Sequence, residues 1–225
     1  GHVDRSGAYY TTGYYERGAP SQWHGRLAGE LGLFGAVDSV DLEHMLSGEI
    51  PGGERFTVRQ GSARRMANDM TFSAPKSVSI QALAIGDAAV TDAHDLAVSR
   101  ALKYIENEVI SARYGRGGEC FEKTGMAAIA AFRHEDARPV DDTADPTLHT
   151  HAIAINVTRD SSGNFRSTEL DFGNQSLRMH LADAIYKATL SQELEHLGYQ
   201  TRRTENGFEL ASISDEQIES FSRRG

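Results

Sequence analysis

An alternating run occupies residues 148–156, with the sequence Leu-His-Thr-His-Ala-Ile-Ala-Ile-Asn. In a β-strand alternate side chains share one face of the sheet, so His149 and His151 point the same way. An earlier apolar run, 126–132, is followed closely by His134. If the two runs pair as antiparallel neighbours, His134 comes within reach of the other two histidines. Three imidazoles that converge in this way predict a metal site with open coordination positions.

The alternative is a purely structural role, which is the usual role of a lone histidine on a strand. Three buried imidazoles this close would repel one another when charged and need partners when neutral, and a metal ion satisfies both conditions. Imidazole suits Mn, Zn, Ni or Fe better than Mg, so the identity of the metal stays open. His2 is excluded as a ligand, and five further histidines are scattered and are expected to be solvated or to cap helices: His24, His44, His94, His180 and His196.

Composition limits the class of protein. A chain of 225 residues forms one domain with a full core, or a core plus one lobe. The single cysteine, Cys120, cannot form an intrachain disulfide, and no segment resembles a signal peptide or a membrane span, so a reducing, cytoplasmic setting is expected. The net charge of −9 argues mildly against nucleic acid as a partner. Basic residues nevertheless cluster in one segment with Asp69 as its lone acid, which allows a basic groove: Arg55, Arg59, Arg64, Arg65 and Lys76.

Hydrophobic spacing and turn residues predict the order of elements. We expect helices at 23–33, 41–46, 91–114 and 177–197, and strands at 70–80 with a bend at Pro75, at 122–134, at 148–158 and at 165–169. The Asn206-Gly207 dipeptide predicts a final hairpin. Strands joined by hairpins, together with two long helices, indicate an α+β fold in which an antiparallel β-sheet carries helices packed on one face.

Two tyrosine pairs stand near the start of the chain, Tyr9-Tyr10 and Tyr14-Tyr15. Such pairs are more often packing residues than catalytic ones. At pH 7 a phenol with a pKa near 10 is only about one part in a thousand ionised, a deficit of roughly 4 kcal/mol for a nucleophile. A neighbouring base or a metal ion must offset that deficit. Asp69 is the candidate base, although an Asp before a strand is also a common turn residue.

Several motifs occur together in a fixed order. After the tyrosine pairs come Trp23-His24-Gly25, then Asp-Met-Thr-Phe-Ser-Ala-Pro-Lys-Ser-Val-Ser at 69–79, then Pro-Thr-Leu-His-Thr-His at 146–151. This array resembles the relaxase domain of conjugative plasmid transfer proteins, the HUH endonucleases of the F-plasmid TraI and TrwC type (MOBF class). The resemblance runs from about residue 9 to residue 220, and the last two motifs together are highly specific.

The resemblance implies the HUH relaxase palm fold and a metal-dependent enzyme that nicks plasmid transfer-origin DNA at one site on one strand. Tyr9 matches the nucleophile, which would leave a 5′-phosphotyrosine adduct and a free 3′-hydroxyl. Tyr14 matches the tyrosine of a later strand transfer, and Asp69 matches the carboxylate beside the nucleophile. The metal ligands would be His134, His149 and His151. The resemblance also implies Mg or Mn in use, with Zn or Ni possible in crystals.

The same resemblance implies the partners. These are single-stranded and supercoiled origin-of-transfer DNA, accessory relaxosome proteins and the coupling protein of a type IV secretion system, in the cytoplasm of a bacterial donor cell and, after transfer, in the recipient. Phosphate contacts are expected from Arg55, Arg59, Arg64, Arg65 and Lys76. We expect residues 1–225 to form one relaxase domain, truncated at the C-terminus relative to the family domain.

Two other functions are compatible with the same residues. One is an inactive or truncated single-stranded DNA-binding module of the same fold. The other is a small-molecule metallohydrolase or oxygenase built on His-X-His, a site that typically adds a carboxylate soon after the pair. Residues 152–157 contain no carboxylate, which disfavours this reading.

Overall fold

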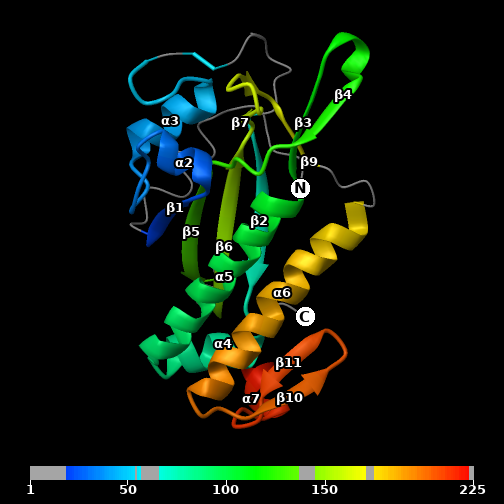
Figure 1. Cartoon of the computed structure of the whole chain (residues 1–225). Coiled ribbons are helices and arrows are strands. Elements are labelled where there is room, and N and C mark those ends of the chain that lie inside the picture. Colours follow the sequence, from blue (N-terminus) through cyan, green and yellow to red (C-terminus); the bar gives the residue numbers. More distant parts are fainter. Residues whose placement is uncertain (1–18, 54, 57–65, 137–144, 171–174, 223–225) are drawn as a thin grey trace. The chain divides into compact units, whose positions relative to one another are not determined.

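The computed structural model describes residues 19–53, 55–56, 66–136, 145–170 and 175–222 (Figure 1). The chain divides into two compact units. The first unit comprises Gly1–Met70, Leu102–Phe132 and His151–His180, and the second comprises Thr71–Ala101, Arg133–Thr150 and Leu181–Gly225. Three strands and two long helices run from residues of one unit into residues of the other, so the units share their elements.

The main sheet has four strands in the order β1-β5-β6-β2. Their bounds are Ser21–His24 for β1, Ile129–Asp136 for β5, Pro146–Ile155 for β6 and Ala67–Ser73 for β2. β1 pairs with β5 in antiparallel register. Asn156 donates its N–H to Met66 O and Ala74 donates to Leu148 O, so β6 and β2 also run in opposite directions. The antiparallel sheet predicted from the hairpin pattern is therefore confirmed.

The first unit contains the apolar core and two smaller sheets. One small sheet has the order β4-β3-β9 (Cys120–Lys123, Ile110–Tyr114, Thr168–Leu170), and the other pairs β7 with β8 (Thr158–Arg159, Phe165–Arg166). Helices α2 (Arg26–Glu30) and α3 (Ser39–Ser47) pack on this core. Its largest buried side chains include Trp23, Leu27, Leu42, Met45, Phe132 and Ile153.

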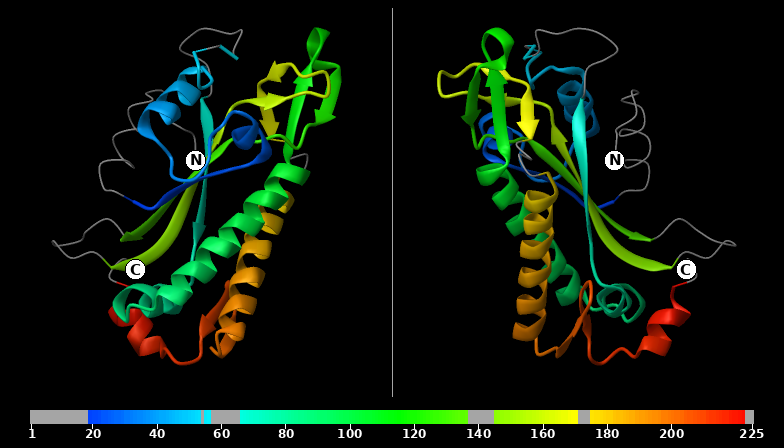
Figure 2. Two further views of the ribbon diagram at one scale, coloured as in Figure 1. Left: turned by 60° about the vertical axis from the view of Figure 1, so that its left-hand side comes forward. Right: turned by 90° about the vertical axis from the view of Figure 1, so that its right-hand side faces the viewer.

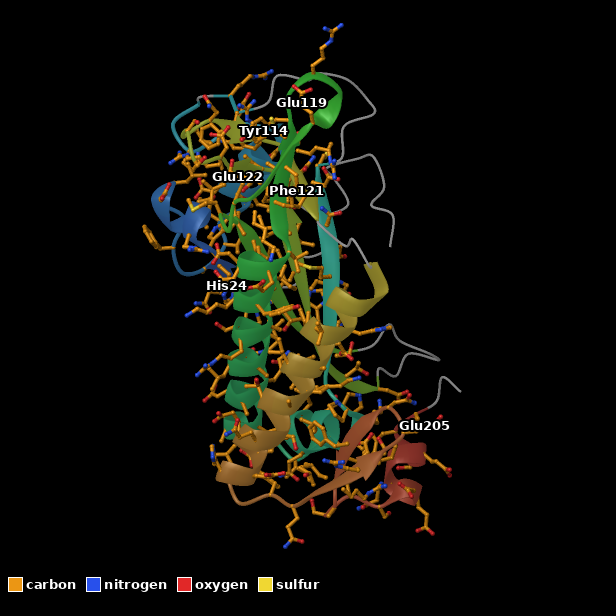
Figure 3. All side chains as sticks on the ribbon, turned by 45° about the vertical axis from the view of Figure 1, so that its right-hand side comes forward. His24, Tyr114, Glu119, Phe121, Glu122 and Glu205 are labelled. Atoms are coloured by element: carbon orange, nitrogen blue, oxygen red, sulfur yellow. The ribbon has the colours of Figure 1, made fainter. Side chains whose placement is uncertain are left out.

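The β3–β4 hairpin, closed by the short 3₁₀ helix Arg116–Gly118, carries aromatic side chains braced by charged ones. The Tyr114 hydroxyl donates to Glu122 at 3.0 Å, and Arg166 lies over the Tyr114 ring at 4.6 Å. Figure 3 shows both partners of the hydrogen bond on this hairpin, with Glu119 near its tip. Cys120, the single cysteine, is exposed on β4.

The expected helix at 23–33 is only partly correct. Residues 21–24 form β1, and helix α2 begins after Gly25, whose φ of 101° is a conformation that favours glycine. A Cβ at this glycine would lie 2.2 Å from Ala127 O. Glu106 fixes the same corner, because its carboxylate accepts from Arg26 N at 2.6 Å and from Ala127 N at 3.1 Å. Strand pairing with β5 and this corner outweigh the helical spacing of the apolar residues.

The expected strand at 70–80 ends at Ser73. A short helix α4 (Lys76–Ser79) follows, continued by the π-helix Ile80–Ala84. Ser77 explains part of this change, because its N–H donates to Glu209 at 2.9 Å and its hydroxyl accepts from Leu210 N at 2.7 Å. These bonds to strand β11 (Gly207–Leu210) come from residues far along the chain, so the local pattern could not reveal them.

The expected helix to residue 114 is also too long. Helix α5 (Ala88–Glu108) ends before β3, and the expected strand at 122–134 is two strands, β4 and β5. Ser111 pairs with Lys123 of β4 on one side and with Glu169 of β9 on the other. Two neighbouring strands therefore decide the conformation of this segment against its helical spacing.

In the second unit, α5 and the later part of helix α6 (Gln175–His196) lie side by side (Figure 2). The ring of Tyr186 lies 5.6 Å from that of Phe72 on β2 and 5.5 Å from that of His94 on α5. Both helices therefore contact the same face of the sheet, as the sequence predicted. His94 is fully buried, which corrects the expectation that it is solvated or a cap.

The second unit also contains β10 (Thr201–Thr204), β11 and helix α7 (Asp215–Ser220). The predicted final hairpin is present, but Thr204 pairs with Gly207, so the turn consists of Glu205, labelled in Figure 3, and Asn206. No helix in the described part of the chain combines the length and the apolar character needed to cross a membrane.

We expect the buried His94 to make stability depend on pH. Burial, assisted by Arg133 and His149, lowers the pKa of His94 from 6.5 to about 3. Between these values the unfolded chain binds a proton that the folded chain does not, so the free energy of unfolding falls as the pH falls. The slope is about 1.4 kcal/mol per pH unit, and the loss between pH 7 and pH 5 is about 2 kcal/mol.

The measurement is urea unfolding at pH 5, 6 and 7 in a chelating buffer, for wild type and His94→Gln. Gln can keep hydrogen bonds but does not titrate. The free energy of unfolding of His94→Gln should therefore fall by about 2 kcal/mol less than that of wild type between pH 7 and pH 5. Equal losses in the two proteins would contradict a neutral His94.

Candidate metal centre

Side chains along strand β6 alternate between buried and partly exposed positions. Leu148, Thr150 and Ala152 are buried, whereas His149 and His151 between them are partly exposed. Successive side chains of a strand point to opposite faces, so the two histidines share the face that the helices do not cover. The expectation from the sequence, that the two rings point the same way, holds in the structure.

His134 on β5 completes the group. The potential ligand nitrogens of His134, His149 and His151 all lie within 4.8 Å of one another. The ring centroids of His134 and His149 are 5.2 Å apart, at an interplanar angle of 75°. Ile155 donates its N–H to Ala128 O. In regular antiparallel pairing, six residues forward along β5 and six residues back along β6 place His134 opposite His149.

Hydrogen bonds fix the orientation of two of the rings. Nδ1 of His149 lies 2.9 Å from the carbonyl oxygen of Thr147. Nδ1 of His151 lies 3.0 and 3.1 Å from the two carboxylate oxygens of Asp69. Carbonyl and carboxylate oxygens only accept, so each Nδ1 carries the proton and each Nε2 presents its lone pair. Neutral imidazoles held in this tautomer by an oxygen partner are typical of metal ligands.

Asp69 therefore lies next to the histidine cluster rather than in a turn. It is an interior residue of β2, and its side chain and that of His151 are each 19% exposed. Its carboxylate orients His151 and makes that ring a better electron donor to a metal. Tyr9 and Tyr14, the tyrosines expected to react, lie outside the described residues.

The donor set fits a divalent transition metal. Three imidazoles, one of them backed by a carboxylate, are the ligands that Mn, Fe, Ni, Cu and Zn accept in proteins. Three protein ligands leave coordination positions open to substrate or water. Within the part of the chain that the structure describes, this is the one group of three or more His, Cys, Asp or Glu side chains placed to share an ion.

The basic residues expected to contact phosphate have varied surroundings. Arg55 pairs with Glu49, with 2.8 Å between Nη2 and Oε1. Lys76 donates to the carbonyl of Pro146 at 2.9 Å, and burial lowers the pKa of Lys76 although the nearby Asp145 acts in the opposite sense. Lys76 thus ties helix α4 to the first residue of β6. The other three candidates lie outside the described residues: Arg59, Arg64 and Arg65.

The residues that support β6 from its covered face were not among those predicted from the sequence. Thr150, between the two ligands, contacts His94, which in turn contacts Tyr186. A signal was available, because His94 stands at helical spacing from Val98 and Ala101 in the apolar stripe of α5. That position predicts an inward-facing side chain.

Sequence comparison identifies the protein family in which this histidine cluster occurs. The sequence model of the TrwC relaxase family matches residues 2–225. The chain belongs to the TrwC relaxase family. It is 36% identical over 209 residues to the multifunctional conjugation protein TraI of Escherichia coli, an alignment that covers 87% of the chain and 12% of TraI. The chain therefore spans about an eighth of the length of that relative.

Solved structures of the conjugative relaxase TrwC are similar over nearly the whole chain. A metal-bound complex of TrwC with oriT DNA is 42% identical, with a TM-score of 0.84, and the match covers 96% of this chain and 75% of that one. A copper-bound TrwC complex with oriT DNA is also 42% identical, with a TM-score of 0.83, over 98% and 73% of the two chains. These structures and the histidine cluster together support a divalent metal site in this family member.

We expect Asp69→Asn to weaken metal binding by roughly 10- to 100-fold, the usual cost of removing the hydrogen-bond partner of a ligating histidine. His149→Ala should weaken it further because a ligand is lost. Isothermal titration with Mn²⁺ measures both effects. Asp38→Asn is the matched control, since Asp38 caps α3 and Asn caps a helix equally well. Wild-type affinity in Asp69→Asn would show that Asp69 does not support the ligand.

Proposed function

We propose that this chain nicks one strand of plasmid transfer-origin DNA by tyrosine transesterification, to begin and end conjugative transfer. One observation carries this proposal. In this member of the TrwC relaxase family, three histidines of β5 and β6 lie together, and Asp69 accepts a hydrogen bond from one of them, His151. Related structures of TrwC contain oriT DNA, in metal-bound and metal-free forms.

In this proposal the phenolate oxygen of Tyr9 attacks the scissile phosphorus. A new P–O bond forms to Tyr9 as the bond to the 3′-oxygen breaks. The 3′-oxygen takes up a proton and leaves as a free hydroxyl, and the 5′-phosphate stays on Tyr9. One phosphodiester replaces another, so the step is reversible and needs no ATP. Tyr14 would carry out a later strand transfer by the same chemistry.

Asp69 has two roles in this proposal. It accepts hydrogen bonds from His151 at 3.0 and 3.1 Å. By its resemblance to the family motif it also matches the carboxylate beside the nucleophile, so it would accept or orient the phenol proton. A carboxylate that already bonds to an imidazole has further lone pairs, so the two roles are compatible.

His134, His149 and His151 would hold the divalent ion through ring nitrogens. When bound, the ion supplies Lewis acidity toward a phosphate oxygen, which makes the phosphorus more electrophilic. We infer Mg²⁺ or Mn²⁺ as the ion in use from the resemblance to the family, and of the two the three imidazoles favour Mn²⁺.

The proposed substrate is single-stranded DNA within a supercoiled origin, held by basic residues and by stacking on aromatic side chains. Accessory relaxosome proteins and a coupling protein of type IV secretion would assemble with the whole protein. The proposed setting is the cytoplasm of the donor cell. We also propose that residues 1–225 function as one DNA-nicking domain.

The first test is covalent capture of DNA. Wild type with Mn²⁺ and a panel of single-stranded transfer-origin oligonucleotides should gain the mass of the 5′-phosphorylated downstream fragment. Tyr9→Phe lacks the nucleophilic oxygen and should form no adduct. Intact-mass spectrometry measures both, and Tyr10→Phe is the matched control that removes the neighbouring hydroxyl.

The outcomes separate the alternatives. A full adduct in Tyr9→Phe would transfer the role to Tyr10 or Tyr14. DNA binding that survives chelation, with no adduct in any variant, would support a binding module without chemistry and contradict the proposal.

A second test concerns the phosphate contacts. Removal of two contacts, by the double change Arg64→Ala and Arg65→Ala, should weaken binding of single-stranded DNA and lower the slope of log K against log salt by about 1.4. Fluorescence anisotropy over a salt series measures the slope. Arg55→Ala should have a smaller effect, because Glu49 already pairs with that guanidinium. A slope unchanged in the double variant would remove these residues from the DNA site.

A further inference from the structure

Two consecutive residues of helix α5 contact the two strands of the histidine cluster from the opposite face of the sheet. His94 contacts Thr150 of β6, and Asp95 contacts Arg133 of β5. Each strand residue is a sequence neighbour of a histidine ligand. Thr150 stands between His149 and His151, and Arg133 immediately precedes His134. The residues next to the ligands on both strands are thus bonded to one turn of one helix.

The contact with β6 is completely buried. His94 is 0% exposed and Thr150 is 3% exposed, and Nε2 of the ring lies 2.8 Å from Oγ1 of the threonine. Nδ1 of the same ring lies 2.7 Å from the hydroxyl of Tyr186 on α6. Both ring nitrogens therefore have a partner, and because either hydroxyl can donate or accept, a neutral imidazole satisfies the whole chain of bonds.

Such a network restrains position more strongly than apolar packing does. A hydrogen bond in a dry interior is directional, and a fully satisfied buried network makes one arrangement of the core clearly the best. The Tyr186 ring also packs on Phe72 of β2, so the network reaches a second strand of the sheet. Thr150 is thereby bonded to α5 directly and linked to α6 through His94.

The contact with β5 is an ion pair. Nη1 of Arg133 lies 2.5 Å from Oδ2 of Asp95, and Nη2 lies 3.4 Å from Glu135 on the same strand. The Arg133 side chain is 18% exposed and the Asp95 side chain 45%, so solvent screens the pair in part. The ion pair therefore restrains the backbone next to His134 as the His94 bond restrains the backbone next to His149 and His151.

We infer that His94 and Asp95 are positioning residues for the metal centre, acting through Thr150 and Arg133 across the thickness of the sheet. The inference rests on the proposed metal centre and deepens it. A metal site tolerates ligand displacements of only about 0.2 Å, and the ligands and the restrained residues share one backbone. Removing either contact lets a strand shift by more than that without unfolding the protein.

The decisive variant is Thr150→Val, which keeps the branched shape and deletes the hydroxyl that His94 contacts. Asp95→Asn tests the second contact. We expect each to weaken Mn²⁺ binding by roughly 3- to 10-fold, less than the loss of a direct partner of a ligand. The EPR spectrum of bound Cu²⁺ should change as well, because it reports ligand geometry and does not respond to stability alone.

Tyr199→Phe is the matched control. The Tyr199 hydroxyl donates to Asp87 and accepts from Gln81 at 3.0 Å, in the same unit but between residues that do not belong to β5 or β6. This variant also loses part-buried hydrogen bonds, so its unfolding temperature should fall. Its Mn²⁺ affinity should stay within twofold of wild type and its Cu²⁺ spectrum unchanged.

The outcomes distinguish the inference from the metal centre itself. Wild-type affinity and an unchanged spectrum in both Thr150→Val and Asp95→Asn, with binding lost in His149→Ala, would overturn the inference and leave the centre intact. Equal binding by wild type and His149→Ala would overturn both. Restored affinity in Thr150→Ser, which returns the hydroxyl, would support the role of the His94 contact against an effect of side-chain shape.

Discussion

The two faces of β6 impose opposite requirements on neighbouring residues. Leu148, Thr150 and Ala152 are buried, and Thr150 contacts His94 of α5, while His149 and His151 between them are partly exposed. Backbone alternation meets both requirements within a few residues, and it links them mechanically. Anything that fixes the buried side chains also fixes the direction of the imidazoles on the other face.

Charged side chains on both faces of the sheet have hydrogen-bonded or ion-paired partners. On the open face Asp69 bonds to His151, which offsets the positive charge that a bound cation would bring close to three imidazoles. On the covered face the guanidinium of Arg133 has acidic partners, and the nearby His94 ring is held neutral by burial. On both faces of the sheet, a charged side chain thus lies beside a partner that can offset its charge.

Much of the site could be predicted from the sequence because its signals are local. The alternation around His149 and the hairpin that returns to His134 need only short-range pairing. Strand β3 was not predicted, because Ile110–Tyr114 continues the helical spacing of α5. Of its two partners only β4 is close in sequence, and β9 follows almost sixty residues later, at Thr168–Leu170. The bonds of His94 and Ser77 were missed for the same reason, since each partner is distant in sequence. The roles of Tyr9 and Tyr14 stay predictions.

The corner at Gly25 limits how this chain can vary. A side chain there would need a backbone conformation that L residues rarely adopt, and its first carbon would collide with a carbonyl oxygen that no rotamer change can move. Glu106 adds a second restriction, because its buried carboxylate accepts hydrogen bonds from the backbone N–H groups of Arg26 and Ala127. In a saturation-mutagenesis library, position 25 would therefore accept glycine almost exclusively, and its tolerance would be set by folding rather than by the chemistry of the histidines.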